Sequence, residues 1–525
     1  LEKVVGNLKN IKTIHLNFSN SELYLPFIYE KEVYKYFVTV NYLHILFIIL
    51  YHIIKVEFRN FFRYVKIKIL IIEKGDYMIL ENNSRLKTIW NLAWPVMVSQ
   101  ILQTLLDIID MYFVSNIGVN EAAAVGIGAS IIGVIIVITQ LIATGAIALI
   151  SRKTGENDDK AVLEITGQAL ILSIAIGILI SILGFSLSTS IIKLFGVEIE
   201  VAKNSINYLK IVSLSMPFVF FNLTGRAILQ ARGDTKTPML IFGLMNLVNI
   251  ILDPILIYGL FCFPRLMFMG APLATAISNV FASVLMFKII LRKIFNDEIK
   301  KCLQVLSIKM NLICKILKIG SYSAVQAISR PITGLVMYKI ANYSGTKAVA
   351  AFTIGGRIFN LVFIFLAGLN LSISVLVGQN LGKKDIESAE SIVKDGIKLA
   401  LINMLIFSLP YFMFAKYLMF IFTKDFEVIN IGANYLRIVY IGVIFVIYPV
   451  VYGGAFVGAG DTAPPMIASL VANLCFKLPM AYILSKVFNM GANGVWIAIS
   501  LSVLLEAAII IYHFRLGKWK NKNVF

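Results

Sequence analysis

From about residue 88 to the end of the chain, long apolar segments alternate with short polar connections. A helix of about 20 apolar residues crosses the hydrocarbon core of a bilayer, so each long segment predicts a membrane-spanning helix. The sequence therefore predicts an all-α integral membrane protein with twelve transmembrane helices. Their approximate spans are 88–114, 126–150, 163–186, 206–228, 237–261, 271–291, 316–341, 350–377, 397–420, 432–457, 464–487 and 493–514.

The pattern repeats at a separation of about 226 residues. QARGDTKTPM at Gln230 corresponds to VGAGDTAPPM at Val457, and MGAPLATAIS at Met269 corresponds to MGANGVWIAIS at Met490. Because each half has an even number of helices, the halves form two parallel six-helix repeats with the same orientation in the membrane. We expect an N-terminal lobe at 78–300 and a C-terminal lobe at 301–525. This symmetry is typical of transporters with a central cavity, although a duplication that serves only stability is the alternative.

Residues 1–77 lie outside the repeat. This leader has an apolar stretch at about 37–54 that could form a thirteenth helix. Residue 1 is Leu, and the first repeat begins just after Met78. Codons for Lys74, Gly75 and Asp76 can form a ribosome-binding sequence before Met78. We therefore predict that Met78 is the natural start, and the alternative is that the leader belongs to the native protein.

The amino-acid composition also indicates a membrane protein. Hydrophobic residues make up 58% of it and charged residues 15%, whereas a soluble domain has about 45–50% and about 25%. The four cysteines are far apart and form no CxxC pair, and His513 is the last histidine and the first after the leader. The chain has no phosphate-binding loop or hydrolase motif. We therefore expect no enzyme activity and no cofactor.

The positive charge marks one side of the membrane. The formal net charge is +19, and the basic residues concentrate in alternate connections, as in the RK pairs at Arg152 and Arg292 and the KK pair at Lys383. Cytoplasmic loops carry this excess, so both termini should be cytoplasmic and the protein should reside in the cell membrane. The same distribution argues against a nucleic-acid partner.

Polar residues follow one face of two predicted helices. Gln100, Gln103, Asp107 and Asp110 are spaced by three or four residues in the first helix, and so are Asn246, Asn249 and Asp253 in the fifth. Ionisable groups are costly inside a membrane, so these faces are functional candidates. We predict that Asp110 and Asp253 bind an ion, H⁺ or Na⁺, whose movement is coupled to transport. The candidates to line a cavity are Gln100, Gln103, Asn246 and Asn222.

Two nearby carboxyl groups in a dry site repel each other's charge, so one of them can hold a proton near neutral pH. With Asn249 and Thr275, the same oxygens could instead surround Na⁺. A structural polar cluster is the alternative. Asp107 could assist or could be hydrogen-bonded within the bundle.

The second half lacks this acidic pair. Carried forward by the repeat, Asp110 corresponds to Val336 and Asp253 to Met480. Ion coupling should therefore belong to the N-terminal lobe. The second half instead has Arg330, Arg357 and Lys477 in apolar segments, and the sequence assigns them no contact with substrate.

Pro95 lies about four turns before Asp110 in the same predicted helix. Proline removes a backbone hydrogen bond and permits a kink. Protonation of Asp110 could switch this helix between straight and bent forms, or the kink could be fixed.

These motifs together resemble the multidrug and toxic compound extrusion (MATE) family. The matching elements are WP at Trp94, IIDMYFV around Asp110, AAAVGIG at Ala122, NIILDP at Asn249 and GAGDT at Gly458. The resemblance implies a two-lobe antiporter of twelve helices that expels organic, often cationic or amphipathic compounds while H⁺ or Na⁺ enters.

Within the family, the chain is similar to the DinF-type branch, because acids are absent from its predicted helices 7 and 10. By matching motif, Asp110, Asn249, Asp253 and Thr275 take the ion-binding roles, and Pro95 matches the bending proline. Asp107 is an extra acid that departs from the family pattern. The alternative function is a related flippase for lipid-linked saccharides. The expected partners are small organic solutes and the bilayer, and the protein should be monomeric.

Overall fold

The computed structural model describes residues 17–18, 21–22, 85–260, 263–298, 305 and 307–524. The chain divides into two compact units, Leu1–Ile79 and Leu80–Phe525. In the first unit, β1 (Asn17–Phe18) pairs antiparallel with β2 (Ser21–Glu22). The leader's apolar stretch at 37–54 and the predicted start at Met78 lie outside the described residues.

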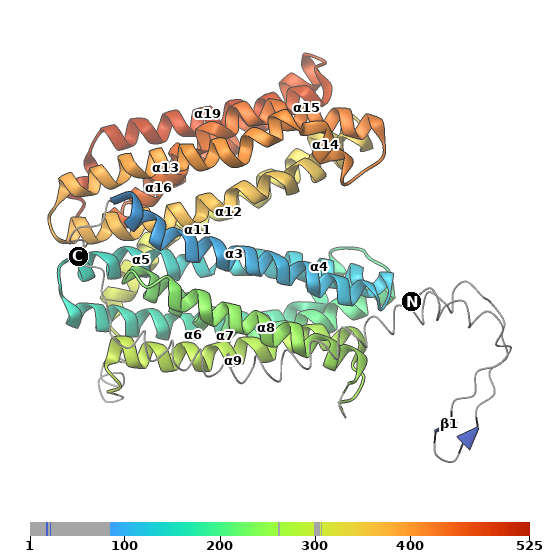
Figure 1. The fold of residues 1–525 in the computed structure, drawn as a ribbon, viewed down its shortest axis with the longest axis horizontal. Coiled ribbons are helices and arrows are strands. Elements are labelled where there is room, and N and C mark those ends of the chain that lie inside the picture. Colours follow the sequence, from blue (N-terminus) through green and yellow to red (C-terminus); the bar gives the residue numbers. More distant parts are fainter. Residues whose placement is uncertain are drawn as a thin grey trace, which may run out of the picture. The chain divides into compact units, whose positions relative to one another are not determined.

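The second unit is helical, and its first group of helices follows the first predicted repeat (Figure 1). The second predicted span is divided between α4 and α5, and the other five correspond to one α-helix each. The elements are α3 (Arg85–Ser115), α4 (Val119–Val137), α5 (Thr139–Gly155), α6 (Asp159–Lys193), α7 (Ile199–Ala231), α8 (Lys236–Tyr258), η2 (Met267–Met269) and α9 (Gly270–Phe295).

The remaining helices follow the second predicted repeat. The eleventh predicted span contains two π-helical segments, η4 and η5, within one helical rod. The elements are α11 (Met310–Asn342), α12 (Thr346–Gly382), α13 (Ile386–Met413), α14 (Ala415–Phe420), α15 (Phe426–Val443), η3 (Ile444–Val446), α16 (Ile447–Ala459), α17 (Ala463–Leu470), η4 (Val471–Lys477), α18 (Leu478–Tyr482), η5 (Ile483–Val487), α19 (Gly491–Arg515) and η6 (Lys518–Asn521).

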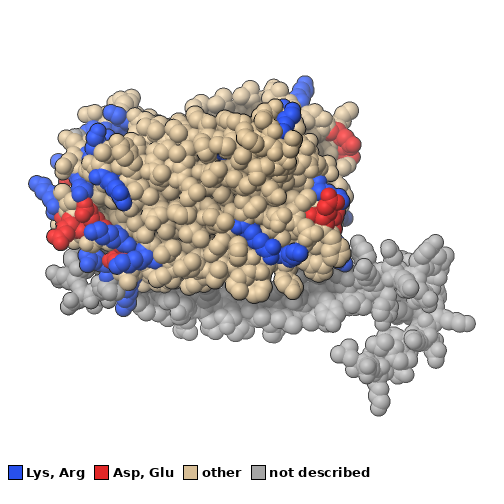
Figure 2. Space-filling model, turned by 90° about the horizontal axis from the view of Figure 1, so that it is seen from above, with Lys and Arg blue, Asp and Glu red and all other residues tan. Residues whose placement is uncertain are grey.

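Eleven helical segments in the described part of the chain are long and apolar enough to cross a membrane. Figure 2 shows charged side chains gathered toward two opposite ends of the molecule, with a mostly uncharged band between them. The all-helical membrane fold is therefore confirmed. The predicted seventh helix coincides with α11, which is not among the eleven segments and carries the basic residues Lys315, Lys318, Arg330 and Lys339. The count of twelve spanning helices stays a prediction.

Two large hydrophobic clusters form the cores of two lobes. One joins buried side chains of α5 to α9 with the start of α11, and the other joins α11 to α19. The second cluster also takes in Ile89, Leu92, Ala93 and Met97 from the first half of α3. Since α3 also packs on α8, with Asp110 of its second half against Asn249, this helix is shared between the lobes.

The lobes repeat contacts as well as sequence. In each lobe a glycine of the second predicted helix lies against a tyrosine of the fourth, and a polar pair joins the same two helices. These pairs are Gly128 with Tyr208 and Asn120 with Glu200 in one lobe, and Gly355 with Tyr435 and Lys347 with Glu427 in the other. The repeated contacts indicate that both halves fold in the same way.

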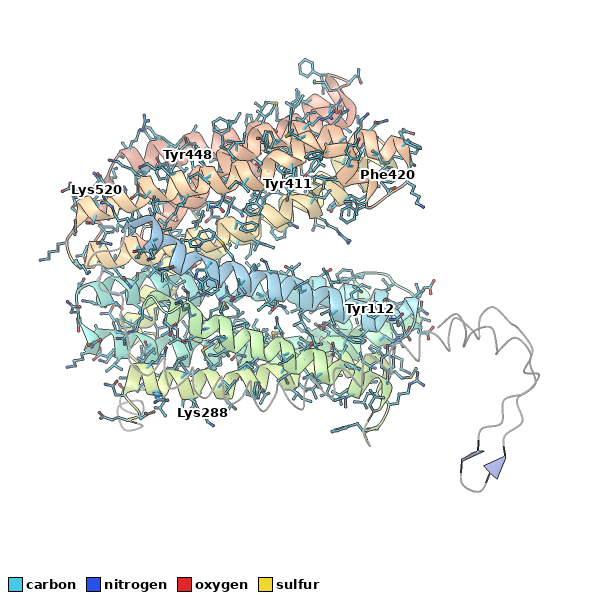
Figure 3. The ribbon with its side chains drawn as sticks, viewed as in Figure 1. Tyr112, Lys288, Tyr411, Phe420, Tyr448 and Lys520 are labelled. Atoms are coloured by element: carbon cyan, nitrogen blue, oxygen red, sulfur yellow. The ribbon has the colours of Figure 1, made fainter. Side chains whose placement is uncertain are left out.

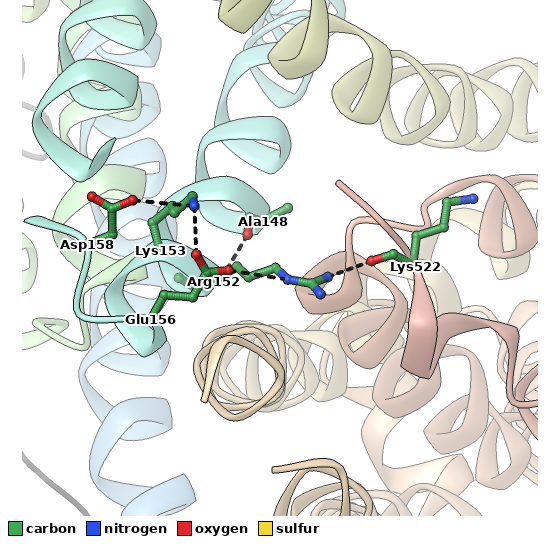
Figure 4. Close-up of polar contacts among 7 residues, drawn as sticks. Ala148, Arg152, Lys153, Glu156, Asp158 and Lys522 are labelled. Atoms are coloured by element: carbon green, nitrogen blue, oxygen red, sulfur yellow. Dashed lines mark hydrogen bonds and ion pairs between the residues drawn. The ribbon is translucent and has the colours of Figure 1, made fainter. Parts of the chain in front are cut away.

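Hydrogen bonds that join the lobes within the described residues lie at one end of the bundle. Arg152 at the end of α5 donates to the backbone oxygen of Lys522 at 2.8 Å (Figure 4). Gln379 near the end of α12 donates to the backbone oxygen of Ala231 at 3.2 Å. Figure 3 places Lys520 at this joined end.

Candidate functional site

The predicted ion-binding residues come from three packed helices of the N-terminal lobe. Asp110 lies in the last turns of α3, Asn249 and Asp253 in the last turns of α8, and Thr275 in the second turn of α9. Helix α8 packs against both α3 and α9. Asn249 and Asp253 are fully buried. The structure therefore brings together the polar faces of α3 and α8 and a residue of α9.

The Asn249 amide lies between Asp110 and Thr275. In the orientation that satisfies both neighbours, its nitrogen donates to Asp110 Oδ1 at 3.1 Å. Its oxygen then accepts from the Thr275 hydroxyl at 3.2 Å and from the Thr275 backbone amide at 3.1 Å. The Thr275 hydroxyl also lies 3.1 Å from the backbone oxygen of Ala271. Asn249 thereby fixes the position of Asp110 relative to α9.

The carboxyl groups of Asp110 and Asp253 lie within hydrogen-bonding reach of each other. Neither oxygen of Asp253 receives a hydrogen bond from a donor group in the described residues. Ionised carboxylates accept hydrogen bonds and donate none, so their close approach requires a proton or a cation. The arrangement can bind a small cation between two acidic side chains.

Tyr208 on α7 is a neighbour of this site that the sequence analysis missed. Its phenol interacts electrostatically with Asp110, Asp253 and Asp107. A lone tyrosine in an apolar helix has no polar spacing that would single it out. Its match with Tyr435 across the repeat was the only signal.

Asp107 lies beside the site and makes a contact of its own. Its side chain is exposed, and Gln103 donates to Asp107 Oδ1 at 3.1 Å on the same helix. Its charge acts on Asp110. Asp107 is therefore an electrostatic neighbour of the Asp110 and Asp253 pair, and its hydrogen bond goes to Gln103.

The predicted cavity-lining residues occupy different environments. Gln100 is exposed, and Asn246 is buried with no hydrogen-bond partner for Oδ1 among the described residues. Asn222 is buried between α7 and α9, where its nitrogen donates to the backbone oxygen of Asn279 at 2.9 Å and its oxygen accepts from Ser283 at 3.0 Å. Only Gln100 of these three presents an exposed side chain.

Pro95 lies within the continuous helix α3. Its side chain is buried, and the Ser99 hydroxyl donates to the Pro95 backbone oxygen at 2.8 Å. Residues on both sides of it, including Leu92 and Met97, pack in the core of the C-terminal lobe. Pro95 therefore lies in the part of α3 held by one lobe, whereas Asp110 lies in the part held by the other.

The described residues contain no group of three or more His, Cys, Asp or Glu side chains that could hold a metal ion. A cation at Asp110 and Asp253 would therefore also rely on amide and hydroxyl oxygens. Asn249 and Thr275 carry such oxygens beside the pair, although the Asn249 oxygen here accepts hydrogen bonds from Thr275. This donor set suits a hard monovalent cation better than a transition metal.

Comparison with known proteins gives one consistent result. The MatE family model matches two segments of the chain, residues 95–255 and 323–483. A relative named probable multidrug resistance protein NorM, from Thermotoga maritima, is 30% identical over 442 residues, which cover 83% of this chain and 94% of that protein.

Two crystal structures share the fold along nearly their whole length. The structure titled MATE in the bent conformation is 25% identical, with a TM-score of 0.77, and the match covers 83% of this chain and 97% of that one. The structure titled MATE in the straight conformation is 25% identical, with a TM-score of 0.76, and the match covers 84% of this chain and 98% of that one. With both halves matched by one family model, the chain belongs to the MATE family of multidrug efflux transporters.

Proposed function

We propose that the chain is a secondary antiporter that exports organic, often cationic or amphipathic compounds in exchange for H⁺ or Na⁺. The grouping of Asp110, Asn249, Asp253 and Thr275 carries this proposal. Two acidic side chains that share one proton or monovalent cation lose one of their two negative charges when loaded, and they repel each other when empty. Loading therefore changes the energy of the lobe that holds them.

Helix α3 can transmit this change. Its first half packs in the core of the C-terminal lobe, and its second half places Asp110 against α8 of the N-terminal lobe. A change of direction near Pro95, which lacks one backbone hydrogen bond, would move Asp110 relative to Asp253. The related crystal structures bear the titles straight and bent conformation. We infer that ion loading favours one of two such arrangements of α3, and that the solute favours the other.

The arrangement of the lobes supports an orientation. They are hydrogen-bonded to each other at the end that holds Arg152 and Lys522, whereas Asp110 and Asp253 lie toward the opposite ends of their helices. With both termini in the cytoplasm of a cell membrane, this state would be closed to the cytoplasm and the ion site would be near the outer side. We also propose that the transporter acts as a monomer.

Within the family, we favour the DinF-type branch, because the oxygen-rich site lies in the N-terminal lobe. The saccharide-lipid flippase is not favoured, since the relatives of this chain are named multidrug resistance proteins. No enzyme activity is proposed, because members of this family are transporters.

The test is efflux of the fluorescent cation rhodamine 123 from proteoliposomes under separately imposed proton and sodium gradients. We expect one of the two gradients to drive transport in the wild type, and Asp110→Asn and Asp253→Asn each to lower the coupled rate at least tenfold. The matched control is Asp297→Asn, because Asp297 is an exposed carboxylate in the connection after α9. Full coupled transport by both site variants would refute the assignment.

A further inference from the structure

The C-terminal lobe contains a second cluster of charged side chains that the ion site does not use. It consists of Lys477 and Asn473 on η4, Glu506 on α19 and Arg330 on α11. Glu506 and Asn473 are buried, Lys477 is half-buried and Arg330 is exposed. The sequence analysis missed Glu506, because it is a single acid in an otherwise apolar helix.

Asn473 connects the members of this cluster. Its side-chain oxygen accepts from the Lys477 ammonium, and its nitrogen lies 3.4 Å from Glu506 Oε2. The same nitrogen donates to the backbone oxygen of Ser469 at 2.9 Å. The charges of Glu506 and Arg330 both act on Lys477, and α11 contacts η4. The four side chains therefore form one electrostatic unit.

The cluster has an excess of positive charge. Two cations face one carboxylate, and neither Arg330 nor Lys477 has a carboxylate within 4 Å among the ion pairs of the described residues. An unpaired cation within a membrane is costly unless it faces water or a counter-ion. Arg330 is exposed, so its guanidinium requires water or an anion beside it instead of lipid.

The repeat relates the helices of this cluster to the helices of the ion site. Asn473 of η4 corresponds to Asn246 of α8, and Met480 corresponds to Asp253. Helix α11 contacts η4 and α18, and α3 contacts α8. The N-terminal lobe thus has carboxyl groups at these positions, whereas the C-terminal lobe has Val336 and Met480 there and places Arg330 and Lys477 earlier on the same helical segments.

We propose that Arg330 and Lys477 bind the anionic group of the transported solute, so that the substrates of this chain include zwitterions. An amine end would be attracted to the carboxyl groups of the N-terminal lobe, and a carboxylate or phosphate end would pair with the C-terminal cluster. Glu506 limits the positive charge of the cluster and keeps the anion releasable. This inference rests on the proposed antiport function but concerns the choice of solute.

The test compares two dyes that differ in one group. Rhodamine 110 has a free carboxylate and is a zwitterion at neutral pH, whereas rhodamine 123 is its methyl ester and is a cation. Binding of each dye to the purified full-length protein is measured by fluorescence polarisation without any ion gradient. Arg330→Gln should weaken rhodamine 110 binding about tenfold or more, because a hydrogen bond between charged groups is lost. Rhodamine 123 binding should change less than about twofold, the change expected when no charged contact is lost.

A second variant should change the affinity for rhodamine 110 in the opposite direction. A misfolded protein would not bind the dye more tightly. Glu506→Gln raises the net charge of the cluster by one and should tighten rhodamine 110 binding severalfold. The control is Lys424→Gln, which removes a positive charge from an exposed connection of the same lobe and should change neither dye.

Equal loss of both dyes in Arg330→Gln, or no loss of either, would overturn the inference. A wild type that binds rhodamine 123 but not rhodamine 110 would also overturn it and would leave the proposed antiport untouched. A wild type that binds neither dye would count against both. Unlike the efflux test, this measurement needs no ion gradient, and its variants leave Asp110 and Asp253 unchanged.

Discussion

At the residue scale, equivalent acidic caps begin the third predicted helix of each repeat. Asp158 Oδ1 accepts from the backbone amide of Ala161 at 3.1 Å before α6, and Asp385 Oδ1 accepts from that of Ser388 at 2.9 Å before α13. A capping side chain satisfies an amide that the helix itself leaves unpaired. Hydrogen bonds from the side chain and backbone of Ser388 hold the pKa of Asp385 below its usual value.

The Asp385 cap should make the stability of the protein depend on pH. A lowered pKa means that the stabilisation is present above the ordinary pKa of aspartate and is lost as the pH falls through the lowered one. We expect Asp385→Ala to cost about 0.5–1 kcal/mol at pH 7, as for an exposed cap, and the cost to shrink toward pH 3. Melting temperatures in detergent across this range test it. Asp385→Asn should retain most of the stability without the pH dependence, and a pH-independent loss in Asp385→Ala would contradict the prediction.

At the element scale, glycines set how closely helices from the two lobes approach. A Cβ atom added to Gly320 of α11 would lie 1.7 Å from the backbone oxygen of Leu141 on α5, and one added to Gly145 would lie 2.2 Å from that of Ile316. No side chain fits at either distance. The crossing of α5 and α11 therefore requires glycine on both helices.

Two glycines of α11 provide a matched pair for this claim. Gly320→Ala should destabilise the protein by about 1–3 kcal/mol, because the helices must separate to accept the methyl group. Gly334 has no atom within 4 Å of an added Cβ, so Gly334→Ala should be neutral or stabilising by up to about 1 kcal/mol from helix propensity. Thermal melting of both variants in one detergent measures the difference, and similar melting temperatures would contradict it.

At the scale of the whole molecule, the C-terminal tail connects the lobes. Trp519 is fully buried and stacks on Phe514. The Lys522 ammonium lies 2.8 Å from Asp461, while its backbone oxygen accepts from Arg152 of the other lobe. The tail thus bridges α5 and the connection that leads into α17. It should favour the state in which this end is closed.

Removal of residues 518–525 should therefore shift the lobes toward opening at this end. Lys160 and Glu387 are both exposed near the joined end. In a variant whose native cysteines are replaced, spin labels at these two positions should move apart. Electron paramagnetic resonance measures the distance between the labels. Labels at Leu194 and Phe426, exposed at the opposite ends of α6 and α15, should approach each other. An unchanged distance in both pairs after truncation would contradict the role of the tail.

The sequence by itself determined the local features of this protein. Apolar length located the helices, because a backbone in lipid must satisfy its own hydrogen bonds. Spacing by three and four residues placed Asp110 on one helical face and Asn249 with Asp253 on another, because the helical period is fixed. The repeat established two equivalent halves, and the family model matches both of them.

Only the tertiary structure decided which of these faces meet. Contact between α3 and α8 brings Asp110 to Asp253 through Asn249, while Asp107, one turn away, pairs with Gln103 instead. The structure also gathers Lys477, Glu506 and Arg330 from three helices, and it closes the lobes at the end with Arg152. These contacts depend on the rotation and crossing of whole helices. Close packing between helices sets that geometry, and the spacing of residues within one helix does not predict it.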